Sequence, residues 1–168
     1  LLLALGANLG AKEAQLKMAI RALETHIGTL LKCSTFYNTA PIGFESPNEF
    51  VNAVALFETS LPPEQVLHIT QQIERELGRT SKTINGIHTD RTIDIDLLTC
   101  DEQVIHTVSL TIPHPRLHKR RFVLEPLCEI FPEGIHPTLH TTYNTLLKQL
   151  NKAMITCETK VTPELLNS

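Results

Sequence analysis

The feature that most constrains this chain is the order in which two hydrophobic periodicities follow one another. Stretches in which every second residue is apolar are typical of half-buried strands, whereas apolar residues three and four apart are typical of helices. In order, the patterns are strand, helix, strand, strand, helix and strand. They cover residues 1–5, 11–27, 29–38, 50–58, 62–77 and 90–98. This order predicts an α+β fold with a ferredoxin-like βαββαβ core, an antiparallel sheet with helices packed on one face.

Residues that begin and end helices support these boundaries. Gly28 and Gly78 follow the two helical stretches, where glycine commonly ends a helix, and the second stretch begins at Pro62-Pro63. Further along, we expect a turn at Asp101-Glu102 and one more strand that runs through Ile112.

The rest of the chain is predicted to contain additional helices and two long loops. Residues 120–131 and 141–151 are expected to form extra C-terminal helices. Residues 39–48 are rich in turn-forming residues, and we interpret them as a functional loop. Residues 79–90 are polar and aperiodic, and we expect them to form a mobile loop.

Length and composition limit the possible functions. A chain of 168 residues suits one domain, which we expect over residues 1–158, with 159–168 as a tail or linker. The net charge of −3 argues against a general nucleic-acid binder, and no apolar run approaches the roughly 20 residues of a membrane span. The four cysteines are widely spaced. They could form two disulfides, but reduced thiols in a cytoplasmic protein are the preferred interpretation.

The strand at 90–98 carries the first candidate site. Its alternation directs Ile93, Ile95 and Leu97 toward the core and leaves Asp94 and Asp96 on the opposite face, about 6.5–7 Å apart along the strand. Two carboxylates this close repel each other, and a hard divalent cation removes the repulsion. Oxygen ligands favour magnesium over zinc. The alternative is an exposed strand face whose charges are solvated by water.

A basic segment, residues 113–122, contains four fixed positive charges and two histidines. Arginine and lysine suit phosphate oxygens, and Arg91 adds a cation three residues before Asp94. Acidic and basic groups around one site are what a magnesium–polyphosphate complex needs. A solvated basic loop is the alternative. The spacing of His114 and His118 is only a weak indication of zinc, because a proline follows the first histidine.

Asn52 lies two residues after Phe50 in a predicted strand, so both side chains share one face of the sheet. An asparagine there can be a hydrogen-bonded polar group within the core. It can also use its donors and acceptor to recognise a flat heterocycle stacked on the aromatic ring. The residues by themselves leave both interpretations open.

Several motifs occur in the order found in one known family. They are residues 6–10 (GANLG), 36–43 (FYNTAPIG), 50–53 (FVNA), 73–79 (IERELGR), 91–96 (RTIDID) and 112–114 (IPH), followed by Arg120 and Phe122. On these motifs the chain resembles the 6-hydroxymethyl-7,8-dihydropterin pyrophosphokinases of folate biosynthesis, from about residue 2 to residue 150. The ordered set is far more specific than any one of its motifs.

The resemblance implies a magnesium-dependent diphosphokinase that transfers pyrophosphate from ATP to the hydroxymethyl group of the dihydropterin, giving AMP and the pterin diphosphate. It implies two Mg²⁺ ions, held by Asp94 and Asp96, and ATP as co-substrate. The expected partners are these small molecules, rather than nucleic acid or a membrane. The resemblance also permits fusion to, or association with, a dihydropteroate synthase.

The resemblance also implies a set of site residues. The catalytic residues would be Arg79, Arg91, Asp94 and Asp96. The ATP-binding residues would be Leu67, Gln71, Glu74, Arg79, Lys82, Arg91, Leu97, Thr111, His114 and Arg120. The pterin-binding residues would be Thr39, Ile42, Phe50, Asn52, Asp94 and Phe122. The two phenylalanines would sandwich the pterin and Asn52 would bond its edge, while backbone groups near Leu97 and Thr111 would bond the adenine.

The chain departs from the family pattern at a few positions. Phe50 lies where the family frequently has a tyrosine, so ring stacking is kept but the hydroxyl is absent. Thr89-Asp90 precedes Arg91 where a small residue and proline are common, Ser81 replaces a frequent arginine, and the loop lacks its common tryptophan. These changes concern loop closure and nucleotide affinity rather than the aspartate pair.

Two other functions fit parts of the pattern. Another magnesium-dependent phosphotransferase or nuclease could use the same aspartates, but it would not need Phe50, Asn52 and Phe122 to converge. A ferredoxin-like RNA-binding module could use the basic segment. Such modules usually display aromatic residues on the sheet, whereas this chain has few aromatics and a negative net charge.

Overall fold

The structure is a computed structural model that describes residues 1–40, 48–78 and 92–160, with side chains as far as Met154. Its strands are β1 (Leu2–Ala7), β2 (Thr29–Cys33), β3 (Tyr37–Thr39), β4 (Phe50–Glu58), β5 (Asp94–Thr99), β6 (Ile105–His106) and β7 (Thr111–Ile112). Its helices are α1 (Lys12–His26), α2 (Pro63–Glu76), a short 3₁₀ helix (Leu117–Lys119), α3 (Arg121–Ile130) and α4 (Tyr143–Lys160).

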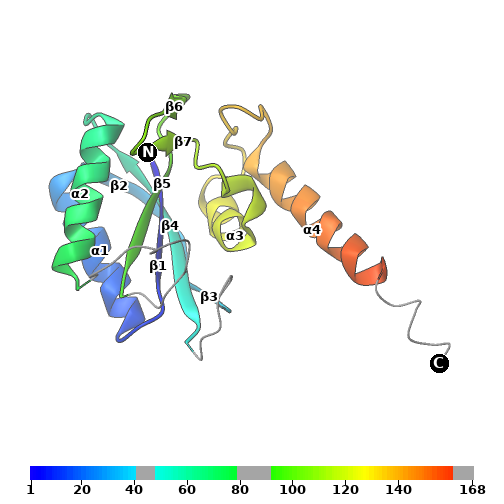
Figure 1. Ribbon diagram of the computed structural model, residues 1–168, viewed down its shortest axis with the longest axis horizontal. Coiled ribbons are helices and arrows are strands. Elements are labelled where there is room, and N and C mark those ends of the chain that lie inside the picture. Colours follow the sequence, from blue (N-terminus) through cyan, green and yellow to red (C-terminus); the bar gives the residue numbers. More distant parts are fainter. Residues whose placement is uncertain (41–47, 79–91, 161–168) are drawn as a thin grey trace.

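The main sheet is antiparallel, with the strand order β2-β4-β1-β5, and β3 pairs with the beginning of β4. Helices α1 and α2 lie side by side on one face of this sheet (Figure 1). The order and the helix placement confirm the predicted ferredoxin-like core. Strand β4 is therefore central and has neighbours along both of its edges.

The first hydrophobic core lies between the sheet and helices α1 and α2. The sheet contributes Leu3, Phe57 and Ile95, and the helices contribute Leu16 and Val66, all at most 1% exposed. Ile95 belongs to the core-facing set that alternation predicted for the strand at 90–98. Burial of side chains of this kind contributes roughly 1.5–3 kcal/mol each to the stability of the folded state.

A second hydrophobic core covers the opposite face of the sheet. Val54 and Leu98 from the sheet pack with Leu117 of the 3₁₀ helix and with Leu124 and Leu127 of α3. Helices α3 and α4, the predicted C-terminal helices, therefore lie across the sheet from α1 and α2 (Figure 1). This leaves the sheet enclosed on both faces, rather than covered on one face alone.

The predicted single strand over residues 29–38 is wrong, because the chain breaks into β2 and β3. The pairing of β2 with β4 shifts between Leu30 and Lys32, so the alternation does not continue. Between the two strands, the N–H of Val54 donates to the side-chain Oγ of Ser34 at 3.0 Å. This bond takes the place of a backbone hydrogen bond between the strands. Local periodicity could not reveal this side-chain bond across to β4.

Three other boundaries also differ from the predictions. The strand expected through Ile112 is a short hairpin of β6 and β7. Strand β1 continues through Gly6 and Ala7, beyond its predicted end at residue 5, and Gly6 pairs with Asn52 and Asp94 on its two sides. Helix α4 runs to Lys160 instead of ending at residue 151.

Parts of the predicted loops lie outside the described residues, namely 41–47 and 79–91, and so do residues 161–168. The expectations for a functional loop and a mobile loop, and for most of the tail, therefore stay predictions. Within the described part of the chain, no helix combines the length and apolar character needed to cross a membrane.

Candidate active site

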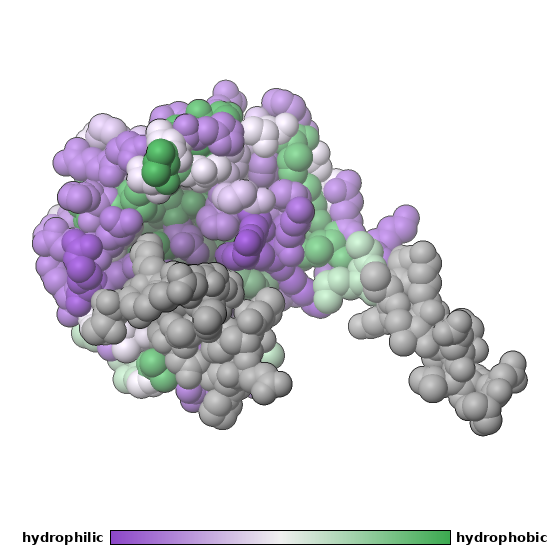
Figure 2. All heavy atoms as spheres, viewed as in Figure 1, coloured by the Kyte–Doolittle hydropathy of each residue, from purple (hydrophilic) through white to green (hydrophobic). Residues whose placement is uncertain are grey.

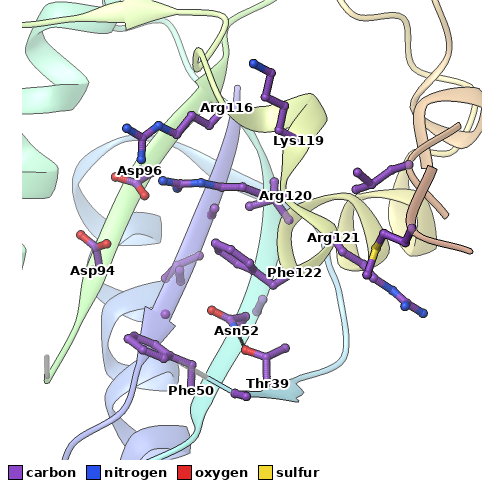
Figure 3. A pocket seen from close by; sticks show the side chains of 18 residues that line it. Thr39, Phe50, Asn52, Asp94, Asp96, Arg116, Lys119, Arg120, Arg121 and Phe122 are labelled. Atoms are coloured by element: carbon purple, nitrogen blue, oxygen red, sulfur yellow. Dashed lines mark hydrogen bonds between the residues drawn. The ribbon is translucent and has the colours of Figure 1, made fainter. Parts of the chain in front are cut away.

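A cavity of about 540 Å³ opens on the sheet face that carries α3 and α4. Its lining comes from β1, β3, β4 and β5, from the basic segment, and from the beginning of α3 and the side of α4 (Figure 3). Figure 2 shows strongly hydrophilic atoms near the middle of the view, between the α2 side of the molecule and α4, with hydrophobic atoms of α4 beside them. The cavity thus combines charged and apolar walls.

The acidic wall is formed by Asp94 and Asp96 of β5. Both carboxylates line the cavity, while their strand neighbours Ile93, Ile95 and Leu97 are at most 4% exposed in the first core. The predicted division of this strand into a core face and an acidic face is confirmed. Figure 3 shows the two carboxylates projecting from β5 to the same side.

Small residues of β1 make room for the cavity beside the acidic wall. Ala4 pairs with Asp96 and Gly6 pairs with Asp94, and both small residues line the cavity. A Cβ on Gly6 would lie 2.9 Å from Oδ1 of Asn52, so even alanine would crowd that amide. Sequence reasoning missed this role of Gly6, and the small–x–small pattern of residues 4 and 6 was its only signal.

The aromatic wall brings together Phe50 of β4 and Phe122 of α3, with Thr39 and Asn52 beside them (Figure 3). The Asn52 side chain is only 6% exposed, and its Nδ2 donates a 2.6 Å hydrogen bond to Oγ1 of Thr39. The amide orientation is thereby fixed. Asn52 is therefore a hydrogen-bonded polar residue and also a cavity-lining one.

The basic segment places several cations at the cavity. Arg116, Lys119, Arg120 and Arg121 all line it, although the sequence-based site included only Arg120. Figure 3 shows Arg116 and Arg120 pointing toward Asp96, whereas Arg121 points away. Arg121 is held there by a 2.6 Å ion pair with Glu125. The charge run was the signal for Arg116 and Lys119, but it could not tell which members face inward.

Arg120 contacts an aromatic ring, and the surroundings of His114 keep its imidazole neutral. The Arg120 guanidinium carbon lies 5.5 Å from the centre of the Phe122 ring, a cation–π contact. Burial lowers the pKa of His114 to about 4, and Arg120 and Arg116 add to this effect while Asp94 opposes it. The imidazole is therefore neutral at pH 7. Its Nδ1 accepts the N–H of Arg116 at 3.1 Å, which leaves the ring proton on Nε2.

Several predicted ATP-binding residues do not line this cavity. They are Leu67, Gln71, Glu74, Leu97, Thr111 and His114. Glu74 is 2% exposed, and its Oε1 accepts the N–H of Ile95 at 3.1 Å, which ties α2 to β5. Leu97 belongs to the first core. Another four predicted residues lie outside the described part of the chain: Ile42, Arg79, Lys82 and Arg91.

The donor set of the acidic wall suits magnesium. In the described residues, no group of three or more histidine, cysteine, aspartate and glutamate side chains is arranged to hold a metal ion. Magnesium commonly binds through one or two carboxylates and completes its shell with water and substrate phosphates. Asp94 and Asp96 offer two such carboxylates in a cavity that also contains cations for phosphate. The residues therefore fit this ion.

Comparison with known proteins gives the family. Residues 2–132 match the family described as 7,8-dihydro-6-hydroxymethylpterin-pyrophosphokinase (HPPK). The chain belongs to this family. The sequence-based assignment is confirmed, and membership supports pyrophosphoryl transfer to hydroxymethyldihydropterin in folate biosynthesis as the function.

Relatives and solved structures agree with this assignment. The chain is 46% identical over 146 residues to the 2-amino-4-hydroxy-6-hydroxymethyldihydropteridine pyrophosphokinase of Porphyromonas gingivalis, covering 83% of this chain and 95% of that relative. The Bacillus subtilis protein of the same name is 43% identical over 129 residues, covering 76% and 75%. A Plasmodium falciparum HPPK-DHPS structure has a TM-score of 0.77 at 16% identity, which shows the fold. This chain covers 45% of that structure's chain, with 97% of its own length aligned.

Proposed function

We propose that the cavity between β4, β5 and α3 is the site of pyrophosphate transfer from ATP to the hydroxymethyl oxygen of 6-hydroxymethyl-7,8-dihydropterin. The observation that carries this proposal is the arrangement of its walls. One cavity contains a carboxylate pair, inward-facing arginines, and two phenylalanines beside a hydrogen-bonded asparagine. A planar acceptor and a polyphosphate donor can therefore be bound next to each other.

The aromatic wall binds the pterin in this proposal. Phe50 and Phe122 supply faces for stacking, and ring stacking contributes about 0.5–1.5 kcal/mol beyond the buried area. Asn52 presents an amide whose orientation Thr39 fixes, so it can bond the heterocycle edge without first being ordered. Such preorganisation reduces the entropy that binding costs.

The acidic and basic groups bind the triphosphate. Asp94 and Asp96 would hold magnesium, with two ions as the family resemblance implies, and the bound ions would neutralise phosphate charge and align the donor. Arg116 and Arg120 point toward this end of the cavity. Their fixed charges suit phosphate oxygens. His114 does not line the cavity, although burial, Arg120, Arg116 and Asp94 influence its pKa, and its contact with ATP stays a prediction from the family resemblance.

The reaction needs alignment and charge stabilisation more than a protein nucleophile. The pterin hydroxyl oxygen forms a bond to the β-phosphorus of ATP and loses its proton to solvent, the bond from that phosphorus to the α–β bridging oxygen breaks, and AMP leaves. In the proposed arrangement the aromatic wall fixes the acceptor, while Arg116 and Arg120 face the phosphates. Arg79 and Arg91 would act on the same phosphates, and their roles stay predictions.

The remaining assignments are predictions that rest on the family resemblance. Leu67, Gln71, Glu74, Lys82, Leu97 and Thr111 would bind the nucleotide, and Ile42 would contact the pterin. A cytoplasmic location, suggested by the cysteine pattern, also stays a prediction, and so does a fusion to, or association with, a dihydropteroate synthase. The solved HPPK-DHPS structures support the fusion, because this chain matches less than half of each of those chains.

The decisive experiment identifies the products. Purified protein is incubated with ATP, MgCl₂ and the hydroxymethyl dihydropterin, and nucleotides and pterins are separated by chromatography. We expect equal amounts of AMP and pterin diphosphate. ADP with a pterin monophosphate would contradict pyrophosphate transfer. Chelation of the metal should stop the reaction, and Mn²⁺ binding measured with a non-hydrolysable ATP analogue should give two ions per chain.

A further inference from the structure

The Glu129 carboxylate connects the end of α3 to the segment that leads into β3. Oε1 and Oε2 accept the backbone N–H of Thr35 at 3.0 and 3.2 Å. Oε2 also accepts the Thr35 hydroxyl at 3.0 Å and the Tyr37 hydroxyl at 2.7 Å. Glu129 itself is exposed and does not line the cavity. Any effect it has on ligand binding must therefore act through other residues.

Strand β3 depends on contacts of this kind because it is short. It has three residues, and its pairing with β4 places Tyr37 opposite Asn52 and Thr39 opposite Phe50. The break before it removes continuity with β2. Two side chains bridge this break: Ser34 bonds the backbone of Val54, and Glu129 bonds the backbone and hydroxyl of Thr35. A three-residue strand without the second bridge would have few bonds to hold its position.

The position of β3 determines the orientation of the Asn52 amide. Thr39, the last residue of β3, accepts the Asn52 Nδ2 bond at 2.6 Å through its Oγ1. Thr39, Phe50 and Asn52 all line the cavity. A small displacement of β3 would therefore change which way the amide points, without removing any residue that lines the cavity.

Helix α3 contributes to the site at both of its ends. Phe122 lies in its first turn on the aromatic wall, and Glu129 lies in its last turn. Seven residues of helix separate the two positions by roughly 10 Å, and this spacing is rigid. Glu129 thus holds β3 at a fixed distance from the helix that carries Phe122.

We propose that Glu129 is a positioning residue for the pterin, which holds β3 so that Thr39 and Asn52 keep their place relative to the Phe122 ring. This inference rests on the proposed pterin site. It adds a residue outside the cavity that controls affinity for one of the two substrates. Because the contacts lie at the pterin end, ATP binding should be independent of them.

The state of the carboxyl supports this role. Burial acts to raise the pKa of Glu129, but the hydrogen bonds from Tyr37 and Thr35 outweigh it and lower the pKa overall. The bond to Glu129 is also the main cause that raises the pKa of Tyr37. At neutral pH an ionised acceptor therefore faces protonated donors, which is the stronger form of such a bond.

The test compares Glu129→Ala and Glu129→Gln with the wild type. KM for pterin and for ATP, kcat, pterin affinity by calorimetry, and melting temperature are measured for each. The Ala variant should raise pterin KM and Kd by about three- to tenfold, with ATP KM unchanged. The Gln variant keeps a carbonyl acceptor for Thr35 and Tyr37, so it should recover most of the loss. Glu133→Ala, an exposed carboxylate just beyond α3, is the matched control and should match the wild type.

A double mutant separates positioning from general destabilisation. If Glu129 acts through Asn52, then Glu129→Ala in an Asn52→Ala background should cause little further loss of pterin affinity. Fully additive losses, equal losses for ATP and pterin, or an Ala variant with wild-type pterin affinity would each overturn the inference. Failure of the wild type to bind pterin or to release AMP would instead overturn the proposed function.

Discussion

At the scale of single residues, Gly6 and Asn52 lie opposite each other in β1 and β4 with no space for a methyl group between them. Gly6→Ala should push the Asn52 amide away from Thr39 and weaken pterin binding by about three- to tenfold. The contact is with the end of a side chain, so the melting temperature should change little. Calorimetry with the pterin alone measures the effect, and unchanged affinity would show that the amide does not bind the ring.

The two aspartates allow a second test at the same scale. Asp94→Asn and Asp96→Asn preserve size, so the fold should remain, but loss of the charge should lower turnover by roughly 10²-fold or more, because metal-ion charge stabilisation contributes several kcal/mol. Asp101→Asn is a suitable control. Asp101 is exposed in the turn after β5 at φ 50°, a conformation that asparagine accepts. Near-normal rates for both cavity variants at saturating magnesium would contradict the assignment.

At the scale of elements, the basic segment and the start of α3 direct similar side chains to different places. Arg116 points toward Asp96, while Arg121 is bound to Glu125 on its own helix (Figure 3). Arg116→Ala should therefore weaken ATP binding by about tenfold, and Arg121→Ala should weaken it considerably less. Titration with a non-hydrolysable ATP analogue and magnesium compares the two. Equal losses would mean that the segment attracts ATP only through its total charge.

At the scale of the whole molecule, His136 connects pH to stability. It is 3% exposed in the segment between α3 and α4, and its Nδ1 accepts the N–H groups of Thr138 and Leu139. Burial lowers its pKa, with contributions from His118, whose ring packs edge-on at 5.9 Å, and from His140. The folded protein therefore favours the neutral ring.

The sign of this pH dependence follows from the lowered pKa. The unfolded chain binds a proton near pH 6.5 and the folded chain only at lower pH, so the free energy of unfolding should fall as pH drops below about 6.5, by at most about 1.4 kcal/mol per pH unit for one proton. His136→Asn keeps an acceptor near Nδ1 but cannot titrate. Urea unfolding between pH 8 and 5 should show that the free energy of unfolding falls less steeply with decreasing pH in this variant than in the wild type. The same pH dependence in both proteins would show that His136 is not the cause.

Much of the fold could be predicted because strand and helix periodicities are local. Alternation correctly separated Asp94 and Asp96 from Ile93 and Ile95, and it placed Phe50 and Asn52 on one face. The break between β2 and β3 could not be predicted, because it depends on bonds from Ser34 to β4 and from Thr35 to a residue 94 positions away. Inward-facing Arg116 could not be distinguished from Arg121 for the same reason.

The sequence by itself determined the order of the main helices and strands, the core face and the acidic face of the strand at 90–98, and the family. Each of these depends on residue types at short spacing or on an ordered set of motifs. Only the tertiary structure decided that α3 crosses the second face of the sheet, which brings Phe122 and Arg120 to the cavity formed by β4 and β5. It also decided that Gly6 lines that cavity and that Glu129 bonds Thr35 and Tyr37. Packing between elements far apart in the chain leaves no periodic trace, because it depends on shape and hydrogen bonding across the folded molecule.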